Sequence, residues 1–271
     1  MVFLATFCCL PAHAQTGQTP DAKQLFEQER WQELVDLLKT SPRASADLNY
    51  YYGVALAHLE SFPEAHNALA AGARMAPRDK RFPIELAGVA FKQNRFSEAV
   101  RDLQRALRLD PKDNYALDFL GTIYFLEGNL EAALKYWKRI GKPKIASVRN
   151  EPHLRVRPAL LDHAFAFAPT GVLTLDQLLA SQERLRLLEI FTGYRIEADA
   201  RGDGNFDVVF RAQELNGFGN TRLETLVRMF SSILFEEITP EYYNIHGSAA
   251  NIRTFFRFDT DKRRASEFVF L

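Results

Sequence analysis

The chain has 271 residues, of which 47% are hydrophobic, and this length suffices for about two domains with buried cores. Lys and Arg together number 34, as do Asp and Glu, so the balanced charge gives no argument for binding nucleic acid or an anionic membrane. The cysteines are the adjacent pair Cys8 and Cys9, which cannot frame a disulfide-linked fold.

The N-terminal segment has the features of an export signal. An apolar run, VFLATFCCL, is followed by Pro11 and then by Ala12-His13-Ala14, a small-x-small cleavage pattern that precedes Gln15. The run is too short to span a bilayer. We therefore expect residues 1–14 to be a signal peptide, and the mature chain to be exported without any cysteine.

The next part of the chain repeats every 34 residues. Small, alanine, aromatic and aliphatic positions recur at this period in three successive stretches, which indicates stacked units. The recurring positions are Ala65, Ala99 and Ala133; Phe62, Phe96 and Leu130; Leu69, Leu103 and Trp137; and Gly53, Ala87 and Gly121. This pattern resembles the tetratricopeptide repeat, a helix pair with the same period. The small residues are expected at close helix crossings, and Phe62 and Leu69 at the seam to the next pair.

The resemblance implies an all-α solenoid over residues 20–145, which opens with a degenerate half-unit, LFEQERWQELVDLLKTSP. Three and a half units form a short arc whose concave groove can bind a partner protein. The repeat register places the following side chains near that groove: Asp47, Tyr50, His58, Arg81, Lys92, Tyr115, Asp118 and Phe125. The alternative is that they form only a solvated face, since many such arrays serve as spacers or scaffolds.

After the repeat the sequence pattern changes. RIGKPKIASVRNEPH has two prolines and a glycine and indicates a linker. RPALLDHAFAFAP alternates with period two and predicts a strand, with His163 as a satisfied core histidine. TLDQLLASQERLRLLEIF predicts an amphipathic helix that begins after Thr174, and GYRIEADA and FDVVFRAQE around RGDGN predict a hairpin. The apolar side chains of the expected strand are Leu161, Phe165 and Phe167, and those of the helix are Leu175, Leu178, Leu179, Leu185 and Leu188.

This order of strand, helix and hairpin resembles a polypeptide-transport-associated (POTRA) domain over residues 153–214. Such domains end in a pattern of apolar positions closed by a glutamate. The matching residues here are Leu185, Leu188, Phe191, Tyr194, Ile196, Phe206, Val208, Phe210 and Glu214. The second helix of the pair that is usual in this family is reduced in the sequence. The resemblance implies a small α/β domain with an exposed sheet edge that can add an extended client segment.

Residues 215–271 resemble the start of the outer-membrane barrel that follows POTRA domains in BamA-like and TamA-like surface antigens. An amphipathic helix and a Pro-Tyr-Tyr turn near Pro240 precede NIRTFFRFDTDKRRASEFVFL, which predicts two alternating strands joined by a polar turn, Asp259 to Lys262. The helix carries Leu223, Leu226, Val227, Phe230, Ile233 and Leu234. One hairpin cannot close, so the resemblance implies an incomplete barrel. The alternative is that these strands extend the small soluble sheet.

No group of residues in the sequence indicates enzyme chemistry. None of the six histidines pairs with Cys, Asp or Glu at metal-ligand spacing. Asp162 and His163 have no serine nucleophile in a GxSxG setting, and the glycines of GDG and GFG lack the strand-loop-helix context of a phosphate site. We therefore expect no enzyme, no cofactor and no metal, and neither nucleic acid nor a small-molecule substrate as a ligand.

The patterns together predict an α+β multidomain protein: a signal peptide (1–14), an all-α tetratricopeptide solenoid (20–145), a small POTRA-like α/β domain (153–214), and a linker helix with a truncated β-barrel start (215–271). The resemblances imply the periplasmic part of an outer-membrane protein in a Gram-negative-type cell envelope. It assembles, inserts or translocates clients, which are protein partners or unfolded β-rich chains, and the repeats serve as the partner-binding scaffold. The alternative is a soluble periplasmic tetratricopeptide scaffold with no transport role.

Overall fold

The computed structural model describes residues 21–39, 45–215, 237–257 and 266–270, together with residues 223, 226–227 and 230–231. The chain divides into two compact units, Met1–Pro111 and Lys112–Leu271. This division falls before the last predicted repeat, whereas the sequence pattern ends the repeat segment at residue 145. The predicted signal peptide lies outside the described residues.

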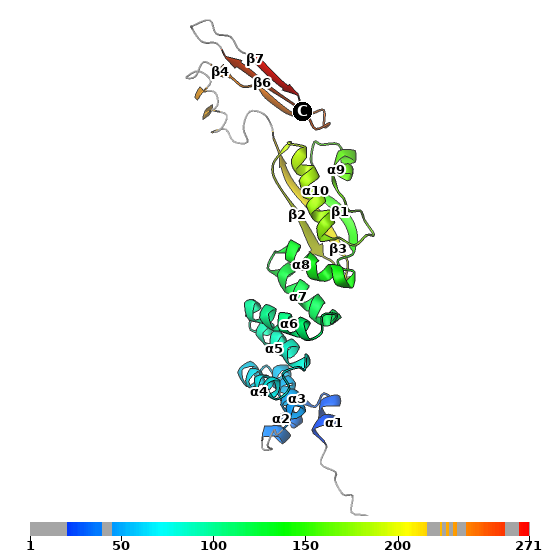
Figure 1. Cartoon of the computed structure of the whole chain (residues 1–271). Helices are drawn as coiled ribbons and strands as arrows, with labels where there is room; N and C mark the ends of the chain where they lie inside the picture. The colour runs from blue at the N-terminus through cyan, green and yellow to red at the C-terminus, as the bar shows by residue number, and fades with distance from the viewer. Residues whose placement is uncertain are drawn as a thin grey trace, which may run out of the picture. The chain divides into compact units, whose positions relative to one another are not determined.

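The first unit consists of paired helices, as the repeat pattern predicts (Figure 1). The helices are α1 (Ala22–Glu27), α2 (Trp31–Lys39), α3 (Ala46–His58), α4 (Phe62–Met75), α5 (Arg81–Lys92) and α6 (Phe96–Leu109). Ser45 caps α3 by accepting a hydrogen bond from the backbone N–H of Leu48. The short pair of α1 and α2 occupies the place of the predicted half-unit.

Glycine and alanine allow the two helices of a pair to lie close together. A Cβ atom added at Gly53 on α3 would lie 2.6 Å from Cγ of Leu69 on α4, which is fully buried. Leu69 therefore packs within its own pair, and the prediction that it lies at the seam to the next pair is wrong. Ala87 and Leu103, one period later, are both fully buried as well, which confirms the 34-residue register in this unit.

The second unit begins with a further helix pair, α7 (Asn114–Leu126) and α8 (Leu130–Trp137), followed by the short helix η1 (Lys138–Ile140). Here Gly121 takes the small position, and an added Cβ would lie 2.5 Å from Cδ1 of Trp137. The indole of Trp137 is buried against the pair in the way that Leu69 is buried in the first unit. The same sequence register thus produces the same packing in both units.

A three-stranded sheet follows, with the strand order β1-β3-β2. Its strands are β1 (Ile145–Glu151), β2 (Phe191–Ala200) and β3 (Phe206–Glu214); β1 runs parallel to β3, and β2 runs antiparallel to it. The predicted hairpin of β2 and β3 is confirmed. The predicted linker is wrong because it contains β1: Pro143 and Pro152 flank this strand and so remove no hydrogen bond from its interior.

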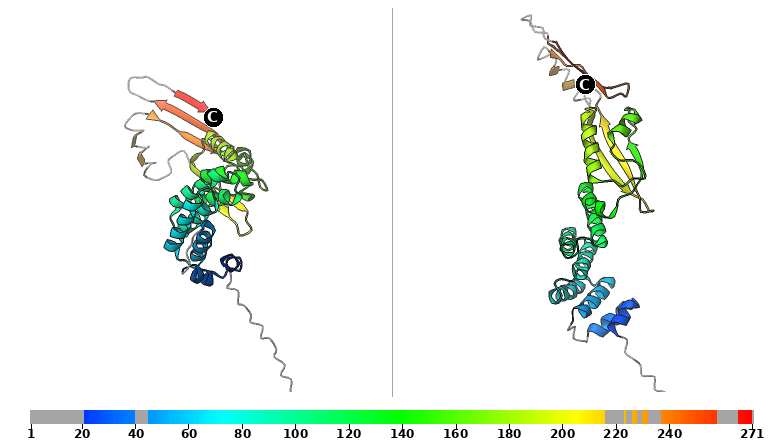
Figure 2. Two further views of the ribbon diagram at one scale, coloured as in Figure 1. Left: turned by 60° about the horizontal axis from the view of Figure 1, so that its bottom comes forward. Right: turned by 45° about the vertical axis from the view of Figure 1, so that its right-hand side comes forward.

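Two helices, α9 (Pro158–Ala164) and α10 (Leu175–Leu187), connect β1 to β2. The capping box that joins Thr174 and Gln177 opens α10, so the predicted helix is confirmed. Leu179 on this helix is nevertheless 45% exposed. In Figures 1 and 2, α10 lies along one face of the sheet, where its Leu178 and Leu185 are buried.

The strand predicted for residues 157–169 is wrong, because α9 occupies its first half. Pro158 stands in the first turn of this helix, where its fixed backbone angle suits a helix and its missing N–H costs nothing. Leu161 and Ala164, three residues apart, are the buried positions, whereas His163 is exposed and not in the core as predicted. The chain then extends from Phe165, and this extended part produced the alternating pattern.

A second sheet contains β4 (Glu237–Ile238), β5 (Glu241–Ile245), β6 (Ala250–Arg257) and β7 (Ser266–Phe270). β6 pairs antiparallel with β7, as predicted, and also with β4 and β5. The predicted turn near Pro240 is wrong, because β5 begins at the next residue and the Pro240 carbonyl accepts hydrogen bonds from Thr254 N and Oγ1, both at 2.9 Å. An edge position suits a proline, which has no N–H to donate.

The helix predicted between Leu223 and Leu234 lies largely outside the described residues. The apolar side chains described there are exposed, namely Leu223, Leu226, Val227 and Phe230. The polar turn predicted at Asp259 to Lys262 lies outside the described residues too. In the part of the chain that the structure describes, no helix combines the length and the apolar character needed to cross a membrane.

Candidate functional site

Three of the predicted groove residues, Asp47, Tyr50 and Arg81, lie together in the first unit. Nη2 of Arg81 is 2.7 Å from Oδ1 of Asp47 and 2.7 Å from Oδ2 of Asp79. The guanidinium carbon of Arg81 lies 4.7 Å from the centroid of the Tyr50 ring. The Tyr50 hydroxyl donates to Oε1 of Glu85 at 3.1 Å. The helices α3 and α5 thus bring these groups into one polar cluster.

The protonation equilibria of this cluster reflect its burial and its ion pairs. Burial and then the charge of Glu85 raise the pKa of Tyr50 well above its usual range. Burial also raises the pKa of Glu85, and the Tyr50 hydrogen bond offsets part of that effect. Hydrogen bonds from Arg81 lower the pKa of Asp79. Each charged or polar group of the cluster therefore already has an internal partner.

The other predicted groove residues lie apart from this cluster, except that the charge of His58 acts on Glu85 and offsets part of the rise in its pKa that burial causes. The ring of His58 stacks on Trp31 at 4.3 Å between centroids, and Lys92 and Tyr115 are exposed. Asp118 accepts a hydrogen bond from Nε1 of Trp137 at 3.1 Å, and Phe125 packs at 5.5 Å from both the Trp137 and the Phe206 rings. In the second unit, Asp118 and Phe125 therefore make internal contacts. These contacts join α7 to Trp137, the last residue of α8, and to β3.

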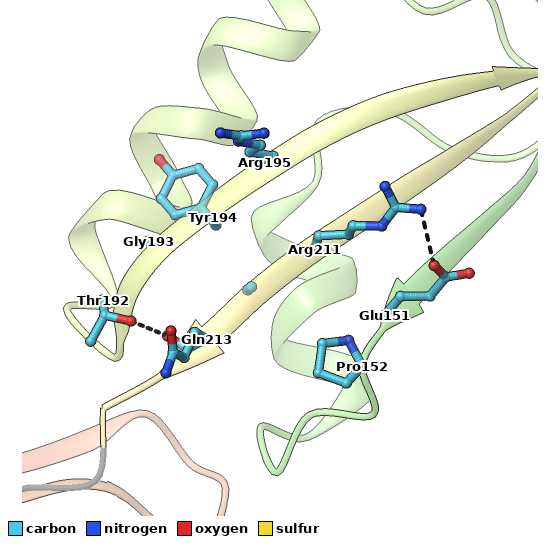
Figure 3. Close-up of a pocket in the computed structure, with 9 residues that line it drawn as sticks. Glu151, Pro152, Thr192, Gly193, Tyr194, Arg195, Arg211 and Gln213 are labelled. Atoms are coloured by element: carbon cyan, nitrogen blue, oxygen red, sulfur yellow. Dashed lines mark hydrogen bonds and ion pairs between the residues drawn. The ribbon is translucent and has the colours of Figure 1, made fainter. Parts of the chain in front are cut away.

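The outer edge of β2 is the second candidate site. Among the described strands, β2 pairs only with β3, so one edge of this ten-residue strand has no strand beside it. A hollow of about 700 Å³ adjoins the strand near Gly193 and Arg195 and extends to Glu151 and Pro152 at the end of β1. Figure 3 shows these residues around the ends of the three strands. An edge with free backbone groups can add a further strand.

The sheet face turned away from α10 carries a network of ion pairs. Nη2 of Arg211 lies 3.2 Å from Oε2 of Glu151, and its Nη1 pairs with Glu197 (Figure 3 draws the first of these). Arg195 stands directly opposite Arg211 in the β2–β3 register. Arg195 is exposed and, within the described part of the chain, makes no ion pair. Two like charges thus face each other across the strands, and only one of them is neutralised.

On the other face, a groove of about 780 Å³ runs beside the same strand. Its apolar lining comes from α7, α8, α10 and β2, and its rim carries carboxylates. The apolar residues are Phe125, Leu130, Leu178 and Ile196, and the acidic ones on this side are Glu127 and Glu131. Arg195, Glu197 and Asp199, which alternate to the opposite face of β2, border the groove along the strand edge. The β2 edge is therefore bordered by a charged hollow on one face and by a partly apolar groove on the other.

Glu214, the last residue of β3, connects two further segments of the second unit. Its side chain is 7% exposed, and Oε2 lies 2.7 Å from Nε of Arg155. Its Oε1 accepts hydrogen bonds from the backbone N–H of Val156 at 2.8 Å and from Nδ2 of Asn244 at 3.1 Å. Asn244 lies in β5, so the carboxylate joins the two sheets.

The turn after Asn244 makes further contacts of this kind. The Gly247 carbonyl accepts from the N–H of Arg157 at 2.9 Å, and Nδ2 of the buried Asn251 donates to the Leu188 carbonyl at 3.0 Å. Gly247 has a φ of +72°, and a Cβ there would lie 2.6 Å from the Arg155 carbonyl oxygen, so this position favours glycine. Among the described residues, no cluster of His, Cys, Asp and Glu could hold a metal ion.

Residues 84–141 match the tetratricopeptide repeat family. This segment is a tetratricopeptide repeat. The match confirms, for this segment, the family expected from the 34-residue period, whose repeats form scaffolds for protein–protein interaction. A search among curated proteins finds no match.

Solved structures of other tetratricopeptide proteins resemble part of the chain. YrrB, described as a TPR protein with an unusual peptide-binding site, is 20% identical with a TM-score of 0.41; the match covers 44% of this chain and 62% of YrrB. MamA from Desulfovibrio magneticus RS-1 is 19% identical with a TM-score of 0.40, over 45% of this chain and 75% of that one. The chain therefore spans less than two thirds of the length of YrrB.

The features that distinguish the β2 edge are not evident from the sequence pattern. The alternation of Tyr194, Arg195 and Ile196 could have placed Arg195 on the outer face of a strand. The lack of an ion pair at Arg195 follows only from the strand register, which sets it opposite Arg211. Glu214 was part of the family pattern, but its contact with Asn244 joins residues 30 positions apart in the chain.

Proposed function

We propose that this chain is an exported, non-enzymatic protein of the bacterial cell envelope. In it, a tetratricopeptide scaffold precedes a POTRA domain and the first strands of an outer-membrane barrel. It acts in the assembly, insertion or translocation of client proteins at the outer membrane. The observation that carries the proposal is the sheet β1-β3-β2, because its open β2 edge gives a client segment a place to pair.

The order of elements supports the POTRA resemblance more fully than the sequence did. A strand, two helices and a hairpin follow one another, since β1 replaces the predicted linker and α9 supplies the helix that is reduced in the sequence pattern. The motif residues Leu185, Val208 and Phe210 are buried in the core of this domain. Phe210 contacts the rings of Phe165 and Phe191 at 5.4 and 5.5 Å.

The proposed mechanism has two steps. The repeat scaffold recruits a partner or an unfolded client, and the β2 edge then captures an extended segment by strand addition. Backbone hydrogen bonds provide affinity with little demand on sequence, which suits clients that are β-proteins themselves. The pairing of β6 with β7 supports the barrel start, because adjacent antiparallel strands are the unit of such barrels.

Site-specific photocrosslinking tests the proposal. A photoreactive amino acid replaces Thr192 on β2 or, as the control, the exposed Leu187 at the end of α10. In a Gram-negative host we expect crosslinks to newly exported outer-membrane proteins from position 192 and not from position 187. Equal crosslinking from both positions, or none from either, would contradict strand capture at this edge.

A second candidate function, a soluble periplasmic scaffold, is favoured by the contacts of β5 and β6. Asn244 and Asn251 are buried against the POTRA-like domain, as strands of an ordinary α+β domain would be. Size-exclusion chromatography of the full chain with and without detergent separates the two candidates. Detergent binding or association in plain buffer supports the barrel start, and a monomer in plain buffer supports the scaffold.

A further inference from the structure

We propose that the β2 edge selects segments with an acidic side chain opposite Arg195 and an apolar side chain at the adjacent position, opposite Ile196. This inference rests on the proposed strand addition at that edge and specifies the chemistry of the segment that is added. It follows from three features of β2: its open edge, the missing charge partner of Arg195, and the different hollows on its two faces.

The pleat of the sheet determines where the side chains of an added strand point. Residues directly opposite each other on neighbouring strands share a face, and successive residues alternate between faces. Arg195 pairs with Arg211, and Arg211 pairs with Glu151, so these three side chains share the face turned away from α10. A residue added opposite Arg195 therefore points to that face, and its neighbour opposite Ile196 points to the other.

Charge favours an acidic residue opposite Arg195. Along the same face of β2, Glu197 pairs with Arg211, and Asp199 lies 3.8 Å from Nη2 of Arg149. Arg195 alone among these three β2 side chains has no ion pair in the part of the chain that the structure describes. Its cross-strand neighbour Arg211 repels it, so a carboxylate from an added strand supplies the missing opposite charge.

The groove on the other face favours an apolar residue. Ile196, Leu178 and Phe125 are its buried or half-buried apolar lining, and Glu127 and Glu131 are exposed beside them. Arg195 borders the groove from the strand edge. An apolar side chain can cover the first three, whereas an acidic one would lie beside like charges. The preferred segment therefore alternates, with apolar residues toward the groove and an acid on the opposite face at the Arg195 position. Barrel strands, which alternate apolar and polar residues, have this pattern.

The experiment measures peptide binding to the full chain in a mild non-ionic detergent by fluorescence anisotropy at low salt. The probes are ten-residue peptides of alternating Val and Thr whose central Thr is replaced by Asp, Asn or Lys. A fourth probe is the Asp peptide with alternate backbone nitrogens methylated, which keeps the side chains but cannot pair as a strand. We expect affinities in the order Asp, Asn, Lys, with about fivefold between Asp and Lys, and no binding of the methylated peptide.

Charge reversal at the edge provides the decisive variant. Arg195→Glu should invert the order so that the Lys peptide binds tightest, and the fold should persist because the substitution removes a like-charge pair. The matched control is Arg101→Glu, which makes the same charge change at an exposed position on α6. Its peptide order should equal that of the unsubstituted chain.

The outcomes separate this inference from the proposed function. If the Asp and Lys peptides bind equally well and the methylated peptide does not bind, strand addition is supported and the acidic preference is overturned. Binding of the methylated peptide as tight as the unmethylated one overturns strand addition. The absence of binding by every peptide overturns both. An inversion caused by Arg101→Glu as well shows that only net charge matters and also overturns the preference.

Discussion

Two exposed arginines, Arg81 in the repeat and Arg195 at the sheet edge, show how differently the two units treat a similar side chain. Arg81 lies between Asp47 and Asp79 and against the ring of Tyr50. Arg195 faces a second arginine and makes no ion pair with a carboxylate of the described residues. A partner of the first cluster must replace existing ion pairs, whereas a partner at the edge can add a missing one. The sheet edge is therefore the stronger candidate for binding, although both sites are rich in charge.

The largest expected effect is a loss of stability on changing the buried core beneath the β2 edge. Phe210 is fully buried and contacts the rings of Phe165 and Phe191. Phe210→Ala should lower the free energy of unfolding of the second unit by about 3–5 kcal/mol, because it leaves a cavity in the core. Hydrogen exchange under native conditions should show this loss at β3 amides and unchanged protection in α3 and α4. Leu187→Ala, at a side chain that is 66% exposed, is the control, and an equal loss there would contradict the core assignment.

A smaller effect is expected at the carboxylate that joins the two sheets. Glu214→Ala leaves the Val156 N–H and Nδ2 of Asn244 without their acceptor, which should cost about 1.5–3 kcal/mol. Hydrogen exchange at Val156 should accelerate. Glu214→Gln keeps one acceptor oxygen and should lose less. If the two variants behave alike and neither changes exchange at Val156, Glu214 does not hold this junction.

The polar cluster of the repeat should respond to pH. Because burial raises the pKa of Glu85, the folded chain keeps a proton that the unfolded chain releases above about pH 4.5, the ordinary value. The folded state then binds more protons than the unfolded state, so the stability of the first unit falls as pH rises from 4.5 through the raised pKa. Thermal melts across this range should show the fall. Glu85→Gln should reduce it and leave the part due to Asp102, whose pKa is also raised by burial. A fall of equal size in the variant would assign it to another group.

The smallest effects test the two arginines directly. Arg81→Ala removes two exposed ion pairs and should lower the stability of the first unit by less than about 1 kcal/mol. Arg195→Ala removes a like-charge contact and should leave the stability of the second unit unchanged or slightly raised. Chemical denaturation measures both. A clear loss on Arg195→Ala would mean that this side chain has an internal role and would weaken the case for a binding site.

The sequence by itself determined the elements whose signals are local. The 34-residue period predicted the helix pairs because each small residue, such as Gly53 or Gly121, meets a large one of its own unit. Thr174 and Gln177 marked the start of α10, and the turn between β2 and β3 marked the hairpin, because caps and turns depend on residues a few positions apart.

Only the tertiary structure decided the elements and contacts that depend on distant residues. Residues 145–151 become a strand because β3, some 60 residues later, pairs with them in parallel. A local sequence pattern does not indicate such a distant partner. The contact of Glu214 with the second sheet and the lack of an ion pair at Arg195 among the described residues also depend on residues distant in the chain. Whether a charge is satisfied depends on which side chains the strand register brings opposite it, and that register is set by the packing of the whole domain.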